Sequence, residues 1–113
     1  MTAMRAEFRS STERLASAAD EQEAYLRQLG TAPSADELAL EFTDALMVEK
    51  THLDEGERTA ALHLDEYLSQ ISGEENAELW TIAALHHAPE WAHVRDLAND
   101  LLRRMNAPAE HEP

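Results

Sequence analysis

The sequence predicts an all-α protein, a single compact domain of four to five helices packed as a roughly antiparallel helical bundle. Apolar residues recur at helical spacing along most of the chain, and no segment alternates apolar and polar residues long enough to form a strand. Hairpin turns of the Asn-Gly or Asp-Gly type are absent. A chain of 113 residues can build one hydrophobic core. We therefore expect a helical domain over residues 1–105 and a disordered tail over 106–113.

The first predicted element is one long helix from about Thr2 to Leu29, which Gly30 ends because glycine readily adopts the left-handed turn at a helix terminus. Ser11 and Gln22 interrupt its apolar face, which consists of Met4, Phe8, Leu15, Leu26 and Leu29. At 1.5 Å per residue this helix would be roughly 40 Å long. Residues 1–19 would then extend beyond the bundle, where they could contact another subunit in a homodimer.

Two central helices follow. Ser34 and Glu37 have the spacing of a capping box, in which the hydroxyl and the carboxylate satisfy backbone N–H groups at a helix start. The apolar residues after them are Leu38, Phe42, Ala45, Leu46 and Leu53, and Gly56 is predicted to end this helix. The next helix is expected from about Glu57 to Ile71, on the spacing of Ala61, Leu64, Leu68 and Ile71. Ser72-Gly73 would end it, and Ser72 and Glu75 suggest a second capping box.

The last third of the chain predicts a short helical segment over about 79–85 and then a final helix. Pro89 stands where proline is best tolerated, in the first turn. The final helix has the most regular amphipathic face, formed by Trp91, Val94, Leu97, Ala98, Leu101, Leu102 and Met105. Trp80 and Trp91 flank the corner at Pro89, and we expect both to be packed in the core.

Composition excludes several classes of function. The chain has 23 acidic and 9 basic residues and a formal net charge of −14, and residues 20–78 hold sixteen acidic side chains against three basic ones. Such a surface repels phosphate backbones and anionic membranes, so nucleic-acid and membrane binding are not expected. The absence of cysteine excludes disulfides, a thiol nucleophile and cysteine-ligated metals. No segment is apolar enough for a membrane span, and the first nine residues do not look like a secretory signal, which together indicate a cytoplasmic protein.

The leading hypothesis is a small acidic helical module that binds and masks a basic protein partner. It resembles an immunity protein or antitoxin only by analogy of size, charge and helicity. An acidic surface of this kind would accelerate association with a cationic target. The candidate contacts are the acidic residues around the inter-helix corners: Asp36, Glu37, Glu41, Asp44, Asp54, Glu55, Glu57, Asp65, Glu66, Glu74, Glu75 and Glu78. Two alternatives are a surface that only confers solubility and a homo-oligomeric helical adaptor that associates through residues 1–19.

A further alternative is a metal site. Glu49 with His52, and Glu90 with His93, both fit Glu-x-x-His, the pattern that ferritin-like di-iron bundles place on two of their four helices. The lone carboxylates would come from Glu66 and from Glu21 or Glu23. Against this hypothesis, Glu90 lies in a first helical turn, where the helix dipole alone favours an acid. The leading hypothesis involves no cofactor.

No other catalytic arrangement is evident. The three glycines cannot form a nucleophile elbow or a phosphate-binding loop. Adjacent acidic residues such as Asp65 and Glu66 diverge by about 100° on a helix and do not form an acid–base pair. His86 and His87 are expected at a helix C-terminus, where the last carbonyl groups stabilise imidazole. The sequence therefore favours a binding protein over an enzyme.

Overall fold

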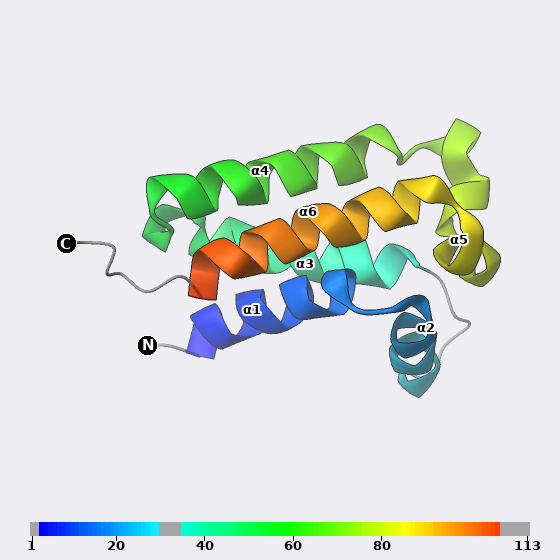
Figure 1. The fold of residues 1–113 in the computed structure, drawn as a ribbon, viewed down its shortest axis with the longest axis horizontal. Helices are drawn as coiled ribbons and strands as arrows, with labels where there is room; N and C mark the ends of the chain where they lie inside the picture. Colours follow the sequence, from blue (N-terminus) through cyan, green and yellow to red (C-terminus); the bar gives the residue numbers. More distant parts are fainter. Residues whose placement is uncertain (1–2, 30–34, 107–113) are drawn as a thin grey trace.

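The all-α prediction is confirmed by the computed structural model, which describes residues 3–29 and 35–106 (Figure 1). These residues contain more helices than the four or five expected. The α-helices are α1 (Ala3–Ala16), α2 (Ala19–Gln28), α3 (Asp36–Glu49), α4 (Glu55–Gln70), α5 (Ile82–His87) and α6 (Pro89–Asn106), and two short 3-10 helices are η1 (Lys50–His52) and η2 (Glu74–Trp80). Within the described ranges, none of the helices has the length and apolarity needed to cross a membrane.

Four of the helices form the predicted antiparallel bundle. Helix α1 packs against both α3 and α6, and α4 packs against α6 (Figure 1). Figure 1 shows α1 running antiparallel to α3 and α6, so that α3 and α6 run in the same direction. The short helices α2 and α5 and the segment η2 gather at one end of the bundle, and α3 passes into α4 at the other.

The core consists of one face from each bundle helix, together with Leu26 of α2 and Leu85 of α5. Phe8 of α1 and Phe42 of α3 are fully buried, with their ring centroids 5.6 Å apart. The other large side chains that are fully buried are Leu15, Leu26, Leu38, Leu64, Leu85, Trp91, Val94 and Leu101. The apolar faces predicted from helical spacing are therefore largely the faces that meet in the core. Exceptions include Leu29, which is exposed, and Leu97 and Leu102, which are only partly buried against the core.

The predicted long N-terminal helix is wrong, because the chain breaks between α1 and α2. Ala18 has extended backbone angles, φ −65° and ψ 154°. The side-chain amide of Gln22, which is completely buried, donates to the carbonyl oxygens of Arg14 at 2.9 Å and Leu15 at 3.1 Å. Arg95 of α6 donates to the carbonyl of Ser17 at 3.2 Å. These bonds satisfy the carbonyl groups that an α-helix leaves free at its C-terminus, and α1 ends at Ala16. Helix α1 packs against both α3 and α6, so it lies within the bundle and does not extend beyond it.

The predicted helix end at Gly56 is also wrong. Helix α3 ends at Glu49, and Gly56 lies in the first turn of α4. Asp54 precedes α4 and forms a capping box with Glu57: the Asp54 carboxylate accepts from the Glu57 N–H at 2.8 Å, and the Glu57 carboxylate accepts from the Asp54 N–H at 3.1 Å. The spacing Asp-x-x-Glu is itself typical of a helix start. The sequence therefore contains, two residues before Gly56, the pattern that predicts the start of α4.

The two capping boxes predicted from serine have different outcomes. Ser34 lies outside the described residues, and the residue that precedes α3 is Ala35. The box at Ser72 is wrong, because the Ser72 hydroxyl donates backwards to the Leu68 carbonyl at 2.7 Å. The break itself is confirmed at Gly73, whose φ of 106° lies in the region that favours glycine.

The corner at Pro89 agrees with its prediction. Pro89 is the first residue of α6. Trp91 is fully buried and Trp80 half-buried, and their rings meet edge to face with centroids 5.3 Å apart. Their indole N–H groups donate to the carbonyls of Leu79 at 2.6 Å and Ile71 at 2.8 Å, respectively. Trp91 is thus a core residue, as expected, whereas Trp80 packs against the core and stays partly exposed. Helix α6 includes Asn106, the first residue of the predicted tail, and residues 107–113 lie outside the described part.

Candidate functional site

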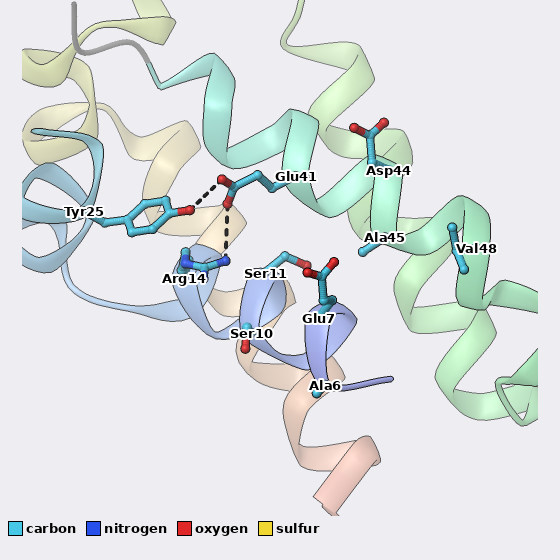
Figure 2. A pocket seen from close by; sticks show the side chains of 10 residues that line it. All are labelled: Ala6, Glu7, Ser10, Ser11, Arg14, Tyr25, Glu41, Asp44, Ala45 and Val48. Carbon is cyan, nitrogen blue, oxygen red and sulfur yellow. Dashed lines mark hydrogen bonds and ion pairs between the residues drawn. The ribbon is translucent and has the colours of Figure 1, made fainter. Parts of the chain in front are cut away.

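A groove of about 570 Å³ lies between α1 and α3, and Tyr25 of α2 stands at one end of it (Figure 2). We call it the α1–α3 groove. Its lining residues are Ala6, Glu7, Ser10, Ser11, Arg14, Tyr25, Glu41, Asp44, Ala45 and Val48. On each helix these positions recur at intervals of three or four residues, so each helix presents one continuous side to the groove. The small side chains of Ala6, Ser10 and Ala45 explain why a hollow remains beside a well-packed core.

Three side chains from three helices meet at the Tyr25 end. The Glu41 carboxylate accepts from the Arg14 guanidinium at 3.2 Å and from the Tyr25 hydroxyl at 2.5 Å (Figure 2). The guanidinium carbon of Arg14 lies 4.3 Å from the centroid of the Tyr25 ring, within the range of a cation–π interaction. The three residues connect α1, α2 and α3 and define one end of the groove. Burial, followed by the hydrogen bond to Glu41, raises the pKa of the Tyr25 phenol above its ordinary value.

This raised pKa predicts a loss of stability at alkaline pH. Because the folded state holds the Tyr25 proton more tightly than the unfolded state, the contribution is complete below the ordinary tyrosine pKa of about 10 and is lost as pH rises through the higher folded-state value. Urea unfolding of the wild type between about pH 9 and 11.5 should show this decline, and Tyr25→Phe should show a shallower one.

Tyr67→Phe is the control for that measurement. Burial also raises the pKa of Tyr67, but its ring lies against His93 on the far side of the bundle and does not contact Glu41. Tyr67→Phe should therefore retain the part of the pH dependence that belongs to Tyr25. Identical pH slopes for the wild type and Tyr25→Phe would show that the Glu41 contact does not hold the phenol proton.

The outer side of α3 exposes large apolar residues beside the groove. Leu40 is 54% exposed, Met47 66% and Val48 52%. In the described part of the chain, the other exposed large apolar residues are Leu29 and Leu62, one each on other segments. We call Leu40, Met47 and Val48 the outer α3 face. Val48 also lines the groove, so the two surfaces are continuous. Exposed apolar residues that gather on one helix next to a groove are typical of interaction sites.

The structure distributes the twelve predicted contact residues over several places. Glu41 and Asp44 line the groove. Asp36, at the start of α3, and Glu74 of η2 line one shallow depression beside Trp80, and Glu37, Glu75 and Glu78 lie in the same two elements. Asp54, Glu55 and Glu57 open α4 at the opposite end of the bundle, and Asp65 and Glu66 lie midway along α4. The acidic residues therefore do not form a single cluster.

Most of these carboxylates are available to an external partner. Glu41 pairs with Arg14, Asp54 and Glu57 cap α4, and Asp65 accepts from the Thr43 hydroxyl at 3.0 Å. Within the described ranges, no hydrogen bond or ion pair is formed by Glu37, Asp44, Glu55, Glu66, Glu74, Glu75 or Glu78. Their charge is not neutralised inside the protein, and so it remains available for attraction of a cation.

The structure does not assemble the alternative metal site. Glu49 and His52 lie at the end of α3 and in η1, whereas Glu90 and His93 lie near the start of α6. Because α3 and α6 run in the same direction, the two pairs are at opposite ends of the bundle (Figure 1). No group of three or more His, Asp or Glu side chains among the described residues could hold a metal ion.

His86 occupies the last turn of α5, as predicted, and has a contact that the sequence did not indicate. Its ring lies 2.9 Å from a Glu23 carboxylate oxygen and 3.7 Å from Asp20, both on α2. Hydrogen bonds from Arg27 and then from His86 lower the pKa of Glu23. This contact holds α2, which carries Tyr25, against α5.

Comparison with known proteins provides no family assignment. The chain matches no family model, no characterised protein and no solved structure at significant similarity.

Six residues of the groove and the outer α3 face were not predicted from the sequence: Glu7, Ser10, Arg14, Tyr25, Met47 and Val48. They lie on three helices that meet only in the folded chain. The outer α3 face could have been predicted, because Leu40, Met47 and Val48 lie away from the core-facing stripe of α3 in the helical spacing.

Proposed function

We propose that the protein is an acidic helical module that binds and masks a basic protein partner. The observation that carries this proposal is the outer α3 face, where exposed apolar side chains stand beside a groove with carboxylates in its lining. Exposed apolar area can supply affinity when a partner covers it. Carboxylates that no internal cation neutralises can supply attraction and partner selection.

The overall charge supports the same type of partner. A formal net charge of −14 favours encounter with a cationic protein and disfavours phosphate-rich ligands. Electrostatic attraction of this kind acts mainly on the association rate and weakens as salt shortens the Debye length. The proposal therefore predicts a basic partner whose association slows with salt.

The test is capture of partners on the immobilised full chain, followed by kinetics with each captured protein. A basic partner should be retained at about 50 mM salt and released at about 500 mM, and its association rate should fall with salt between those values. The double variant Glu37→Lys/Asp44→Lys should slow association by about tenfold.

Glu13→Lys/Asp96→Lys is the matched control, since it makes the same change in net charge at two exposed residues outside the acidic region 20–78. Net charge changes equally in both variants, so a difference between their association rates reports where the charges lie. The association rate of the control should remain within about threefold of the wild-type rate, because its two residues lie outside the expected contact surface. A partner without excess basic charge, or an association rate that does not change with salt, would contradict the proposed function.

A further inference from the structure

We infer that the α1–α3 groove binds a basic amphipathic helix of the partner. The apolar side of the partner helix would pack against Val48, and the cationic side chains of the partner helix would pair with Glu7 and Asp44. This inference rests on the proposed function and adds to it the location of the binding site and the chemistry of the segment that binds.

The shape of the groove fits a helix. Its walls are two antiparallel helices, and the lining residues span 6–14 of α1 and 41–48 of α3, so a third helix can lie against them for about 12 Å, or roughly two turns. Ala6, Ser10 and Ala45 are small, and small residues allow the backbone of a packed helix to approach closely. An amphipathic helix in an apolar groove is a recurrent mode of peptide recognition.

The apolar contacts lie on one side of the groove. Val48 is both a lining residue and half exposed, and Met47, the next residue, is 66% exposed. A helix lying in the groove would cover Val48 and the adjacent part of the outer α3 face. Burying exposed apolar surface contributes a favourable free energy of about 25 cal/mol per Å², so covering this region would stabilise a complex.

The charges determine which kind of helix fits. Glu7 comes from the α1 wall and Asp44 from the α3 wall (Figure 2). Neither forms a hydrogen bond or ion pair with another residue in 3–29 or 35–106. The one cation in the lining is Arg14, and Glu41 already pairs with it. The groove thus presents unneutralised negative charge on both walls, which complements lysine or arginine side chains that flank an apolar stripe.

A second copy of this chain is a poorer occupant. Each copy carries a formal charge of −14, so two copies repel one another. In the described part of α6, which has two adjacent arginines near its end, Asp100 pairs with both Arg103 and Arg104. Charge complementarity therefore favours a basic helix from another protein.

The experiment uses the isotope-labelled full chain and a synthetic peptide of about 18 residues, about five helical turns. Leucines at positions i, i+3, i+4 and i+7 form its apolar stripe, and lysine and arginine occupy the other side. A second peptide has the same composition in scrambled order, without the stripe. We expect the amphipathic peptide to shift backbone resonances of residues 6–14 and 41–48, and the scrambled peptide to bind at least about tenfold more weakly.

Two variants locate the site. Val48→Lys places a cation in the groove and removes its apolar contact, and should raise the Kd for the amphipathic peptide by about tenfold or more. Leu62→Lys makes the same chemical change on α4, at a residue 44% exposed and outside the groove lining, and should change the Kd by less than about twofold. Both positions are exposed, so both variants should fold, and unchanged helical circular dichroism would confirm that they do.

The outcomes separate this inference from the proposed function. If the peptide binds in a salt-dependent way but shifts η2 or the start of α4, or if Leu62→Lys weakens it as much as Val48→Lys, the groove is the wrong site while basic-partner binding stands. Concentration-dependent shifts of the groove resonances without peptide, with the mass of a dimer, would show that a second copy is the occupant and overturn the inference. Absence of binding by both peptides at millimolar concentration would also overturn it. The proposed function itself fails only if the captured partners are not basic or associate independently of salt.

Discussion

Replacing Trp91 by alanine is expected to lower the free energy of unfolding by about 3–5 kcal/mol, the range for removing a buried aromatic side chain. Trp91 is completely buried, its ring meets Trp80 edge to face, and its indole N–H donates to the carbonyl of Leu79. The substitution leaves a cavity and an unpaired carbonyl at the corner where η2, α5 and α6 meet. Urea unfolding followed by far-ultraviolet circular dichroism measures the change.

Two further variants keep this prediction testable if Trp91→Ala does not fold. Trp91→Phe retains most of the buried area and should cost less than the alanine variant while losing the bond to Leu79. Leu62→Ala removes a large apolar side chain that is 44% exposed and should change stability by no more than about 0.5 kcal/mol. A loss for Trp91→Ala as small as that for Leu62→Ala would contradict the assignment of Trp91 as a core anchor.

Replacing Arg95 by alanine is expected to cost about 2–3 kcal/mol, since hydrogen bonds from a charged group are among the stronger ones and their loss leaves acceptors unpaired. Arg95 donates to the carbonyl oxygens of Ser17 and Leu85 and, at 3.0 Å, to the side-chain oxygen of Gln22. One side chain thus joins the α1–α2 junction and the end of α5 to α6. Burial lowers the pKa of the guanidinium, which agrees with its partly enclosed position.

The region in which amide exchange changes distinguishes the role of Arg95 at the α1–α2 junction from a general effect of losing one positive charge. Amide hydrogen exchange should become faster at residues 17–22 in Arg95→Ala, because the carbonyls that hold the junction lose their donor. Arg103→Ala is the control, since Arg103 is 71% exposed and its pair with Asp100 contributes about 0–1 kcal/mol. If Arg95→Ala costs no more than Arg103→Ala, the junction is held by Gln22 and local backbone preference without help from α6.

The helical class and the core faces could be predicted because they depend on local spacing. Most of the stripe from Trp91 to Met105 is buried along α6, with Leu97 and Leu102 partly buried beside it. Phe42 and Leu64 are buried where their periodicity places them. Burial of an amphipathic face is the main source of helix stability in proteins, so the pattern reports it directly. The corner at Pro89 and the break at Gly73 could be predicted equally well, since the proline ring fixes φ and glycine readily adopts the positive φ found at Gly73.

Helix ends were predicted less well where two local signals competed. Gly56 looked like a terminator, but the capping box of Asp54 and Glu57 begins a helix before it, and glycine is tolerated in a first turn. Ser72 looked like a cap, but its hydroxyl donates to Leu68 in the turn that precedes it. A side chain that can bond either forward or backward leaves a boundary undecided until the surrounding structure is known.

The candidate site could be predicted only in part. An acidic surface follows from composition, and Glu41 and Asp44 were among the expected contacts. Glu7, Arg14 and Tyr25 were not, because they belong to helices that approach α3 only after the bundle forms. The two Glu-x-x-His pairs are not brought together in the described residues, since a matched spacing in the sequence does not place two pairs at one level of a bundle.

Local information in the sequence by itself determined the all-α class, the buried faces and the strongly acidic surface, because helical periodicity, proline and glycine geometry and formal charge do not depend on distant residues. Tertiary structure alone decided where the N-terminal segment breaks. The bonds from Gln22 and Arg95 to the end of α1 exist only when α6 lies alongside. Tertiary structure also decided that Val48 and Met47 stay exposed and that small residues on α1 and α3 leave a groove between these two helices. The reason is that the packing of one helix against another determines which side of each helix remains exposed.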